Sequence, residues 1–318
     1  MIVYVAVRLF YLGVILIVMS VLVFLITQAM PGDVAHLIAG QFASEDVVQA
    51  IAEKLGLDAP LPVQYWRWAS GILRGDLGES LIMERPIGPI LGEALTRSAV
   101  LAAVSFASVC VIGIGLGVVS ATQRNRPLDH GISILTYLGI SVPEFFWGIV
   151  LVLLFAGYFK WLPSGGYAPL DEGVWNWARH LILPTATLTF ALVAHVSRLT
   201  RSSMLEVLES QYVKTARAKG MPERIVVLRH ALRNALLPTI TVLAIDIGVL
   251  IGGMVVVETV FSFPGMGRLL LFAIERHDLP LIQASILVIT AIYCLANLIA
   301  DLLYAYFNPK IRYGRARA

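Results

Sequence analysis

Charged side chains are scarce in this 318-residue sequence. Asp, Glu, Lys and Arg together make up 14% of the chain, whereas apolar residues make up 58% and the mean hydropathy is +0.80. A soluble domain carries roughly 25% charged residues. The shortage of charge therefore excludes an ordinary soluble protein and favours one that is embedded in a lipid bilayer.

Residues that carry chemistry are equally rare. The two cysteines, Cys110 and Cys294, lie in apolar stretches, and neither has a second cysteine or a histidine at the spacing of a zinc site. There is no HExxH motif, and no glycine run ends in Gly-Lys-Ser/Thr. We therefore expect no catalytic residue, no metal site and no cofactor bound by this chain. The glycine runs suit close helix packing instead; they contain Gly113, Gly115, Gly117, Gly248, Gly252 and Gly253.

What the chain has in abundance is long apolar runs. Six are long enough to span a bilayer, which takes about 20 residues each. The third contains Pro143, where a kink or tilt is expected, and the fourth is the shortest. The fold class predicted is thus an all-α, polytopic membrane protein with about six transmembrane helices. The runs are Leu9–Ala29, Ser98–Ala121, Gly131–Phe159, Leu181–Ser197, Ala235–Val257 and Leu281–Phe307.

The distribution of basic residues predicts the orientation. If the N-terminus is cytoplasmic, the inner segments hold fifteen Lys and Arg and the outer segments hold nine. Inner loops of membrane proteins carry the excess of positive charge. Both termini are therefore expected in the cytoplasm, which requires an even number of spans.

Two connections are too long to be simple loops, and they suggest three parts. Residues 1–30 form an N-terminal transmembrane helix. Residues 31–97 form an extracytoplasmic segment with a small helical element, signalled by Ser44-Glu45-Asp46. Residues 98–318 form a five-helix core that contains a large inner loop at 198–234.

The inner loop has the clearest local pattern. Good helix formers run from Ser203 to Lys219, Gly220 suits the left-handed residue that ends a helix, and Pro222 with Glu223 favours a restart. A patch of small side chains lies on this helix, ringed by positive charge. From physical reasoning alone, the patch fits a docking surface and an ordinary basic surface helix equally well. The residues concerned are Lys214, Thr215, Ala216, Arg217, Ala218, Lys219 and Gly220.

The same loop resembles a known motif. Thr215-Ala216-x-x-x-Gly220, followed by His230-Ala231-Leu232 and Asn234-Ala235-Leu236-Leu237-Pro238, is similar to the cytoplasmic "EAA" loop of binding-protein-dependent ABC importer permeases. Further pieces resemble the dipeptide, oligopeptide and nickel permeases in particular. The motif's leading Glu is replaced by Lys214, its first Ala by Thr215 and its later Pro by Arg233, as the peptide-type subfamily would have. The further pieces are Pro31-Gly32-Asp33, Gly75-Asp76-Leu77-Gly78, Glu258-Thr259-Val260-Phe261 and Pro264-Gly265-Met266-Gly267.

The resemblance implies a fold and a set of partners. The fold would be that of a type I ABC importer permease in the bacterial inner membrane, with residues 214–220 as a helix that couples to an ATPase. The partners would be a second homologous permease, two ATPase subunits that carry ATP and magnesium, and an extracytoplasmic solute-binding protein, with no nucleic acid. The solute would be dipeptides or oligopeptides; nickel chelates, glutathione or another small solute is the alternative. The outer positions Gly75, Asp76 and Phe263 would engage the binding protein.

Ionisable residues within the spans are candidates for a translocation path. Asp246, midway along the fifth run, and Glu144, after Pro143, are the two candidates. The alternatives are a helix–helix hydrogen bond for Asp246 and local capping for Glu144. His195 is expected at the membrane interface. Two other function classes have less support. An intramembrane enzyme would need paired catalytic groups within the spans, and a secondary transporter would favour internal repeats; the sequence shows neither.

Overall fold

The computed structural model describes residues 2–29, 44–46, 49 and 59–307. Most of the small helical element expected within 31–97, and the basic C-terminal tail, lie outside the described residues. The helices are α1 (Ile2–Gln28), α4 (Leu61–Leu73), α5 (Ile87–Ser108), η1 (Val109–Gly113), α6 (Ile114–Thr122), α7 (Pro127–Ser141), α8 (Glu144–Leu151), η2 (Val152–Tyr158), η3 (Leu170–Glu172), α9 (Val174–Leu208), α10 (Gln211–Ala218), α11 (Glu223–Ile225), η4 (Val226–Ala231), α12 (Leu232–Val260), α13 (Met266–Glu275) and α14 (Leu279–Phe307).

Five helical segments of the described residues are long and apolar enough to cross a membrane. They are 5–28, 87–122, 174–208, 223–260 and 279–302. The pair α7 and α8 makes a sixth crossing if it counts as one broken span. The prediction of about six spans therefore holds.

The third span differs most from the prediction. We expected one helix with a kink over 131–159, but α7 and α8 meet at an angle of 110°. Val142 is extended, with φ −120° and ψ 134°, and Pro143 starts the next helix. A residue before proline avoids the helical region, and proline cannot donate the helical hydrogen bond. The disturbance at Pro143 was predicted, but a kink within one helix understated it, because Val142 leaves the helical conformation and the helix breaks there.

The fourth span was predicted too short. In place of residues 181–197, α9 runs for 35 residues from Val174 to Leu208 and continues through Pro184. The polar residues at both ends lower the hydropathy of the sequence without stopping the helix. The apolar run therefore marked only the middle of the helix.

The described chain forms two compact units. The first combines Met1–Leu95 with Leu269–Cys294, and the second combines Thr96–Arg268 with Leu295–Ala318. In the first unit, Phe24 of α1 packs against Tyr65 and Trp68 of α4, with ring centroids 5.5 and 5.9 Å apart. Asp278 in the same unit is fully buried and accepts a hydrogen bond from the Ser80 hydroxyl at 2.5 Å. The aromatic contacts hold α4 against α1, and the hydrogen bond holds the turn with Ser80 against Asp278.

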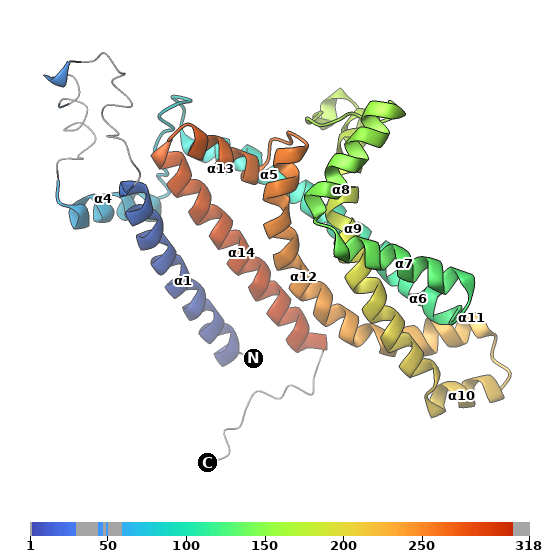
Figure 1. Ribbon diagram of the computed structural model, residues 1–318. Coiled ribbons are helices and arrows are strands. Elements are labelled where there is room, and N and C mark those ends of the chain that lie inside the picture. The colour runs from blue at the N-terminus through green and yellow to red at the C-terminus, as the bar shows by residue number, and fades with distance from the viewer. Residues whose placement is uncertain (1, 30–43, 47–48, 50–58, 308–318) are drawn as a thin grey trace. The chain divides into compact units, whose positions relative to one another are not determined.

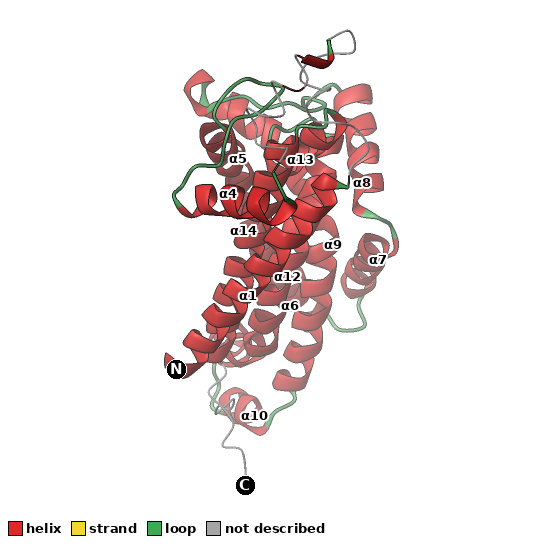
Figure 2. Ribbon diagram, turned by 90° about the vertical axis from the view of Figure 1, so that its left-hand side faces the viewer, coloured by secondary structure: helices red, strands yellow, loops and turns green. Residues whose placement is uncertain are grey.

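The second unit is built around α9. Its apolar core contains Leu188, Leu192 and Val196 of α9 together with residues of α5, η1 and α12. Figure 1 shows α9 and α12 side by side, with α10 and α11 at one end of both. Figure 2 shows α10 from another side, again beyond the end of α9.

Glycines bring α6 and α9 together. A Cβ on Gly117 would lie 2.5 Å from the Thr200 side chain, and one on Gly113 would lie 2.9 Å from Val196. The predicted role in close helix packing is confirmed for Gly113, at the end of η1, and for Gly117 of α6. Gly115 and Gly252 have open space around their Cβ positions, so for them the prediction was wrong.

Candidate functional site

The loop at 198–234 begins with a break that the sequence reasoning missed. We expected one helix from Ser203 to Lys219, but α9 ends at Leu208 and α10 starts at Gln211. Ser210 between them is extended, with ψ 153°, and its hydroxyl donates back to the Val207 carbonyl at 2.6 Å. Serine competes for backbone hydrogen bonds in this way and favours breaks. The break turns α10 away from the α9 axis.

The C-terminal end of α10 follows the prediction. Gly220 has φ +76°, its backbone N–H donates to the Arg217 carbonyl at 2.9 Å, and the Met221 N–H donates to the Ala216 carbonyl at 3.4 Å. These two bonds are the pattern in which a left-handed glycine closes a helix. The chain then restarts as α11 directly after Pro222. The predicted left-handed glycine and helix restart are confirmed.

The inner face of α10 packs on its own chain. Val213 and Ala216 are buried, at 0% and 6% exposure. They belong to an apolar cluster with residues from four other segments, which we call the α10 cluster. Its members are Ala121, Met204, Val213, Ala216, Val226, Val227, Ala231 and Ala235. Ala216 was expected on the docking face beside Thr215 and Ala218; that placement was wrong, because Ala216 is three residues from Val213 and so shares its face.

The outer face of α10 is exposed. Lys214, Thr215, Ala218 and Lys219 all point away from the α10 cluster. They follow one another around the helix on the side opposite Val213. The structure therefore offers a surface of two small and two cationic side chains on a helix that is firmly packed from behind.

Polar contacts hold α10 at both ends. The guanidinium of Arg217 donates to both carboxylate oxygens of Glu223, at 3.1 and 2.6 Å, and also to the Leu208 carbonyl at 3.4 Å. The hydrogen bond from Arg217 to Glu223 raises the pKa of Arg217. The Asn234 amide of α12 donates to the Tyr212 hydroxyl at 2.8 Å. Arg217 and Tyr212 are thus committed to contacts within the chain.

Asp246 lies between α9 and α12. It is 2% exposed, and its Oδ1 lies 3.2 Å from Nδ1 of His195. Its Oδ2 is buried and has no hydrogen-bond partner among the described residues. His195 was expected to take a plain interfacial position, and the structure instead makes it the partner of Asp246. The contact is the helix–helix hydrogen bond that was the alternative for Asp246.

Glu144 occupies the first turn of α8, directly after the break. Its carboxylate faces Gly253 of α12, where a Cβ would come within 2.6 Å of Oε1. Among the described residues, the Glu144 side chain has no hydrogen bond that would cap α8, and its carboxylate lies against α12. Asp246 is a residue of α12, so both candidates lie at this helix.

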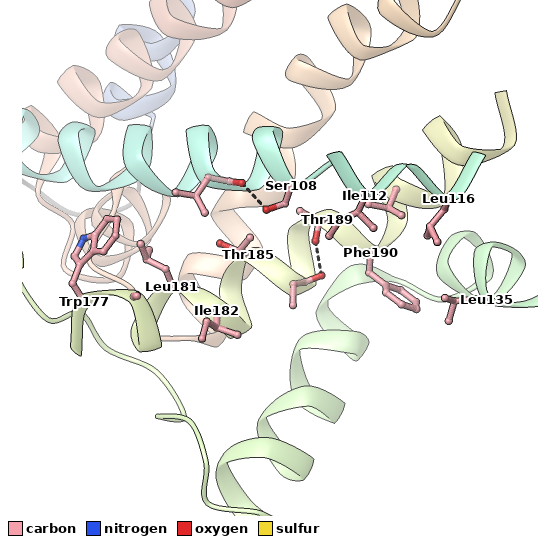
Figure 3. Close-up of a pocket in the computed structure, with 14 residues that line it drawn as sticks. Ser108, Ile112, Leu116, Leu135, Trp177, Leu181, Ile182, Thr185, Thr189 and Phe190 are labelled. Atoms are coloured by element: carbon pink, nitrogen blue, oxygen red, sulfur yellow. Dashed lines mark hydrogen bonds between the residues drawn. The ribbon is translucent and has the colours of Figure 1, made fainter. Parts of the chain in front are cut away.

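An apolar groove runs along α9 (Figure 3). Its volume is about 520 Å³. Its hydroxyl groups mostly bond to their own helices: Ser108 donates to the Val104 carbonyl and Thr189 to the Ala186 carbonyl. The lining has no Asp, Glu, His, Lys or Cys side chain that could act as an acid or a base beside these hydroxyls. Its lining residues are Val104, Ser108, Ile112, Leu116, Leu135, Trp177, Ala178, Leu181, Ile182, Thr185, Ala186, Thr189, Phe190 and Val193.

Glu258 organises the segment between α12 and α13. It is fully buried and accepts hydrogen bonds from Ser98 at 2.5 Å and from the Gly267 N–H at 2.7 Å. In the sequence, this segment was identified only by its resemblance to a motif of the permease family. We also expected Phe263 to engage a binding protein, but Phe263 is 0% exposed and packs edge-on against Tyr167. A buried ring cannot make that contact, so the prediction for Phe263 was wrong.

The long apolar helices and the packed helix–turn–helix define a multi-pass membrane protein. The chain belongs to a specific family of transport subunits. Residues 113–313 match the model of the binding-protein-dependent transport system inner membrane component, and residues 1–106 match the model of its N-terminal part. The family consists of ABC transporter permeases, so the chain is a transport subunit and not an enzyme.

Relatives and a solved structure agree with this family. The chain is 41% identical to the "Probable peptide ABC transporter permease protein" of Sinorhizobium fredii over 294 residues, 92% of this chain and 94% of that protein. It is 42% identical to a glutathione transport system permease protein of Pectobacterium atrosepticum over 298 residues, 94% and 95% of the two chains. An inward-facing structure of the MetNI methionine ABC transporter matches with a TM-score of 0.54 at 16% identity. It covers 69% of this chain and 96% of that chain, which shows the shared fold.

Proposed function

We propose that this chain is one permease subunit of an ATP-driven importer in the bacterial inner membrane, and that it carries peptides. The relatives named above are described as peptide and glutathione permeases, and glutathione is itself a small peptide. This favours di- and oligopeptides over nickel chelates. A second permease, two ATPase subunits and an extracytoplasmic binding protein complete the proposed complex.

The observation that carries the proposal is the exposed face of α10. ATP and magnesium would bind to the ATPase subunits, because this sequence has no Gly-Lys-Ser/Thr loop. The ATPase would receive the face with Lys214, Thr215, Ala218 and Lys219 in a groove. Small side chains allow close approach of a partner, and a rigidly packed helix transmits a displacement. Movement of the ATPases on ATP binding then reaches α9 and α12 through the α10 cluster.

The polar groups beside α12 are assigned to the translocation path in this proposal. Asp246 supports it because one of its oxygens is buried without a partner, and ionisable groups at membrane depth commonly serve transport. Glu144 supports it through its place at the α7–α8 break, next to Gly253. Gly75 and Asp76 stay proposed for the contact with the binding protein.

The test compares two tryptophan substitutions on opposite faces of α10. Ala218→Trp overfills the exposed face, and we expect capture of the ATPase subunits to fall by about 5- to 160-fold, since overpacking of this kind costs about 1–3 kcal/mol. The thermal unfolding temperature of the isolated permease should not change. Ala216→Trp overfills the α10 cluster, so it should lower that temperature.

The measurements are pull-down of the ATPases from detergent and uptake of a dipeptide into proteoliposomes. Ala218→Ser serves as the control that keeps the surface small, and it should retain capture and uptake. If Ala218→Trp assembles and transports like the unsubstituted protein, α10 is a plain basic surface helix and the proposal fails.

A further inference from the structure

Asp129, at the start of α7, is a buried carboxylate with hydrogen-bond donors on several sides. It is 2% exposed. Arg201 of α9 donates to both of its oxygens, from Nε at 2.7 Å and from Nη2 at 2.8 Å. The Ser120 hydroxyl of α6 and the Asn125 backbone N–H, at 3.0 Å, donate as well. Four donors from three segments therefore converge on one side chain.

This carboxylate joins α7 to the ends of α6 and α9, which also carry residues of the α10 cluster. The α10 cluster contains Ala121 at the end of α6 and Met204 near the end of α9, together with Val213 and Ala216 of α10. The ends of α6 and α9 therefore move with α10. No residue of α7 belongs to that cluster, and Asp129 supplies the polar link.

The geometry of the link is directional. A guanidinium that binds a carboxylate with two parallel hydrogen bonds fixes the angle between the two groups as well as their distance. The further contacts of α7 with α9 are apolar; at one of them Gly139 lies against Phe190 and Ala194. The hydrophobic effect that drives such contacts is non-directional. Asp129 therefore adds a directional constraint on the orientation of α7 relative to α9.

We propose that Asp129 is a positioning residue for transport: it locks α7 onto the α10 cluster, so that a displacement of α10 is delivered to α7. The inference rests on the proposed function, in which an ATPase moves α10. From α7 the displacement reaches the break at Val142 and Pro143, where the chain changes direction by 110°.

A second ion pair in the same region provides a matched control. Arg124 of the α6–α7 turn meets Glu209 at the end of α9 at 2.7 Å, but the two side chains are 53% and 69% exposed. Exposed pairs contribute little, because water and salt screen them. The Arg201–Asp129 pair, at 30% and 3%, is much better shielded. Both pairs join the α6–α7 region to α9, so they differ mainly in burial and geometry.

The experiment uses the assembled complex in proteoliposomes. Asp129→Asn keeps the shape of the side chain and removes its charge. Arg201→Lys keeps the positive charge but cannot form the two parallel hydrogen bonds of the guanidinium. Glu209→Gln is the control. We measure ATPase subunits retained, ATP hydrolysed and dipeptide taken up per ATP. Asp129→Asn should keep the ATPases and lower uptake per ATP about fivefold, a typical size for a change in coupling. Arg201→Lys should be intermediate and Glu209→Gln unchanged.

A distance measurement separates positioning from folding. With Cys110 and Cys294 replaced by serine, spin labels go on the exposed positions Ile134 of α7 and Glu206 near the end of α9, which lies outside the docking face but moves with the α10 cluster. In the otherwise unsubstituted chain, the distance distribution should be narrow and the same with and without ATP. With Asp129→Asn it should broaden and change with ATP.

The outcomes decide between the two ideas. If Asp129→Asn leaves both uptake per ATP and the label distance unchanged, the inference is overturned. It is also overturned if Asp129→Asn and Arg201→Lys both lose the ATPase subunits, because the pair then acts in folding alone. Failure of the docking proposal looks different: Ala218→Trp would retain the ATPases, whatever Asp129→Asn does.

Discussion

Ala216 and Ala218 lie two residues apart on α10 and have opposite environments. Ala216 is 6% exposed inside the α10 cluster, whereas Ala218 is exposed. Two residues turn an α-helix by about 200°, so the same small side chain packs the core at one position and clears space for a partner at the other. Whether an alanine on α10 packs the core or faces a partner is decided by the direction of its side chain and not by its residue type.

Gly220 is required for its backbone conformation alone. Its φ is +76°, and a Cβ added there would meet nothing within 4 Å. Gly220→Val should therefore cost about 1–3 kcal/mol through backbone strain and loosen the end of α10. We expect weaker capture of the ATPase subunits in a pull-down. Gly220→Asn is the control, since asparagine tolerates the left-handed conformation; equal capture by the two variants would contradict the assignment.

Asp246 separates a transport role from a purely structural one. Asp246→Asn retains a hydrogen bond to His195 and removes the charge, so the helices should stay together while uptake of a dipeptide into proteoliposomes falls. We expect the initial rate to drop by roughly tenfold, because a hydrogen bond to a charged group is worth about 1.5–3 kcal/mol and one to a neutral amide about 0.5–1.5 kcal/mol. Thr239→Val is the control, because it removes another contact between α9 and α12, the 3.2 Å pair with Thr200. If Asp246→Asn took up dipeptide at the normal rate, the role of Asp246 would be limited to the hydrogen bond between α9 and α12.

The length of α9 determines where α10 is presented. Thirty-five residues span about 52 Å, and the hydrocarbon core of a bilayer is about 30 Å thick. A large part of α9 therefore lies outside the apolar layer. Its last turns expose polar side chains, as expected for a helix that continues into water; these are Arg198, Ser202, Glu206 and Glu209. The α10 surface is thus held clear of the lipid by the helix that precedes it.

The crossing of α6 and α9 provides a matched pair of glycines. Gly117→Ala would bring a methyl group to 2.5 Å from the Thr200 side chain and 2.7 Å from the Ser197 carbonyl. Because backbone must shift to relieve the clash, the thermal unfolding temperature in detergent should fall, with a cost of about 1–3 kcal/mol. Gly115→Ala points into open space and should be neutral or slightly stabilising. Equal effects of both substitutions would mean that the crossing is not tight at Gly117.

For the whole molecule, the orientation in the membrane decides whether α10 can reach a cytoplasmic ATPase. The docking proposal needs α10 inside, and the excess of basic residues on that side predicts the same. We therefore expect the loop that contains α10, and both termini, in the cytoplasm, with residues 31–97 outside.

Cysteine labelling in intact cells tests this orientation. In a chain with Cys110 and Cys294 replaced by serine, Ser44→Cys should react with a membrane-impermeant reagent. Lys214→Cys should be protected until the cells are lysed. The reverse pattern would place α10 outside and exclude its contact with a cytoplasmic ATPase.

Features that depend on neighbours along the chain could be predicted from the sequence. Six apolar runs predicted the spans because each run is long enough on its own, and Gly220 with Pro222 predicted the end of α10 because turn geometry is local. Pro143 predicted a kink in the third span for the same reason. The resemblance of the inner loop to the EAA motif gave the permease family, and with it the place to look for the site.

Contacts between residues far apart along the chain became visible only in the folded structure. His195 and Asp246 are separated by 51 positions, and Asp129 and Arg201 by 72. No local pattern pairs such residues, because their contact depends on how three or more helices pack. The burial of Ala216 and Phe263 and the 110° angle between α7 and α8 have the same origin. Packing selects one face of each helix and one angle at each break from the several that the local sequence permits.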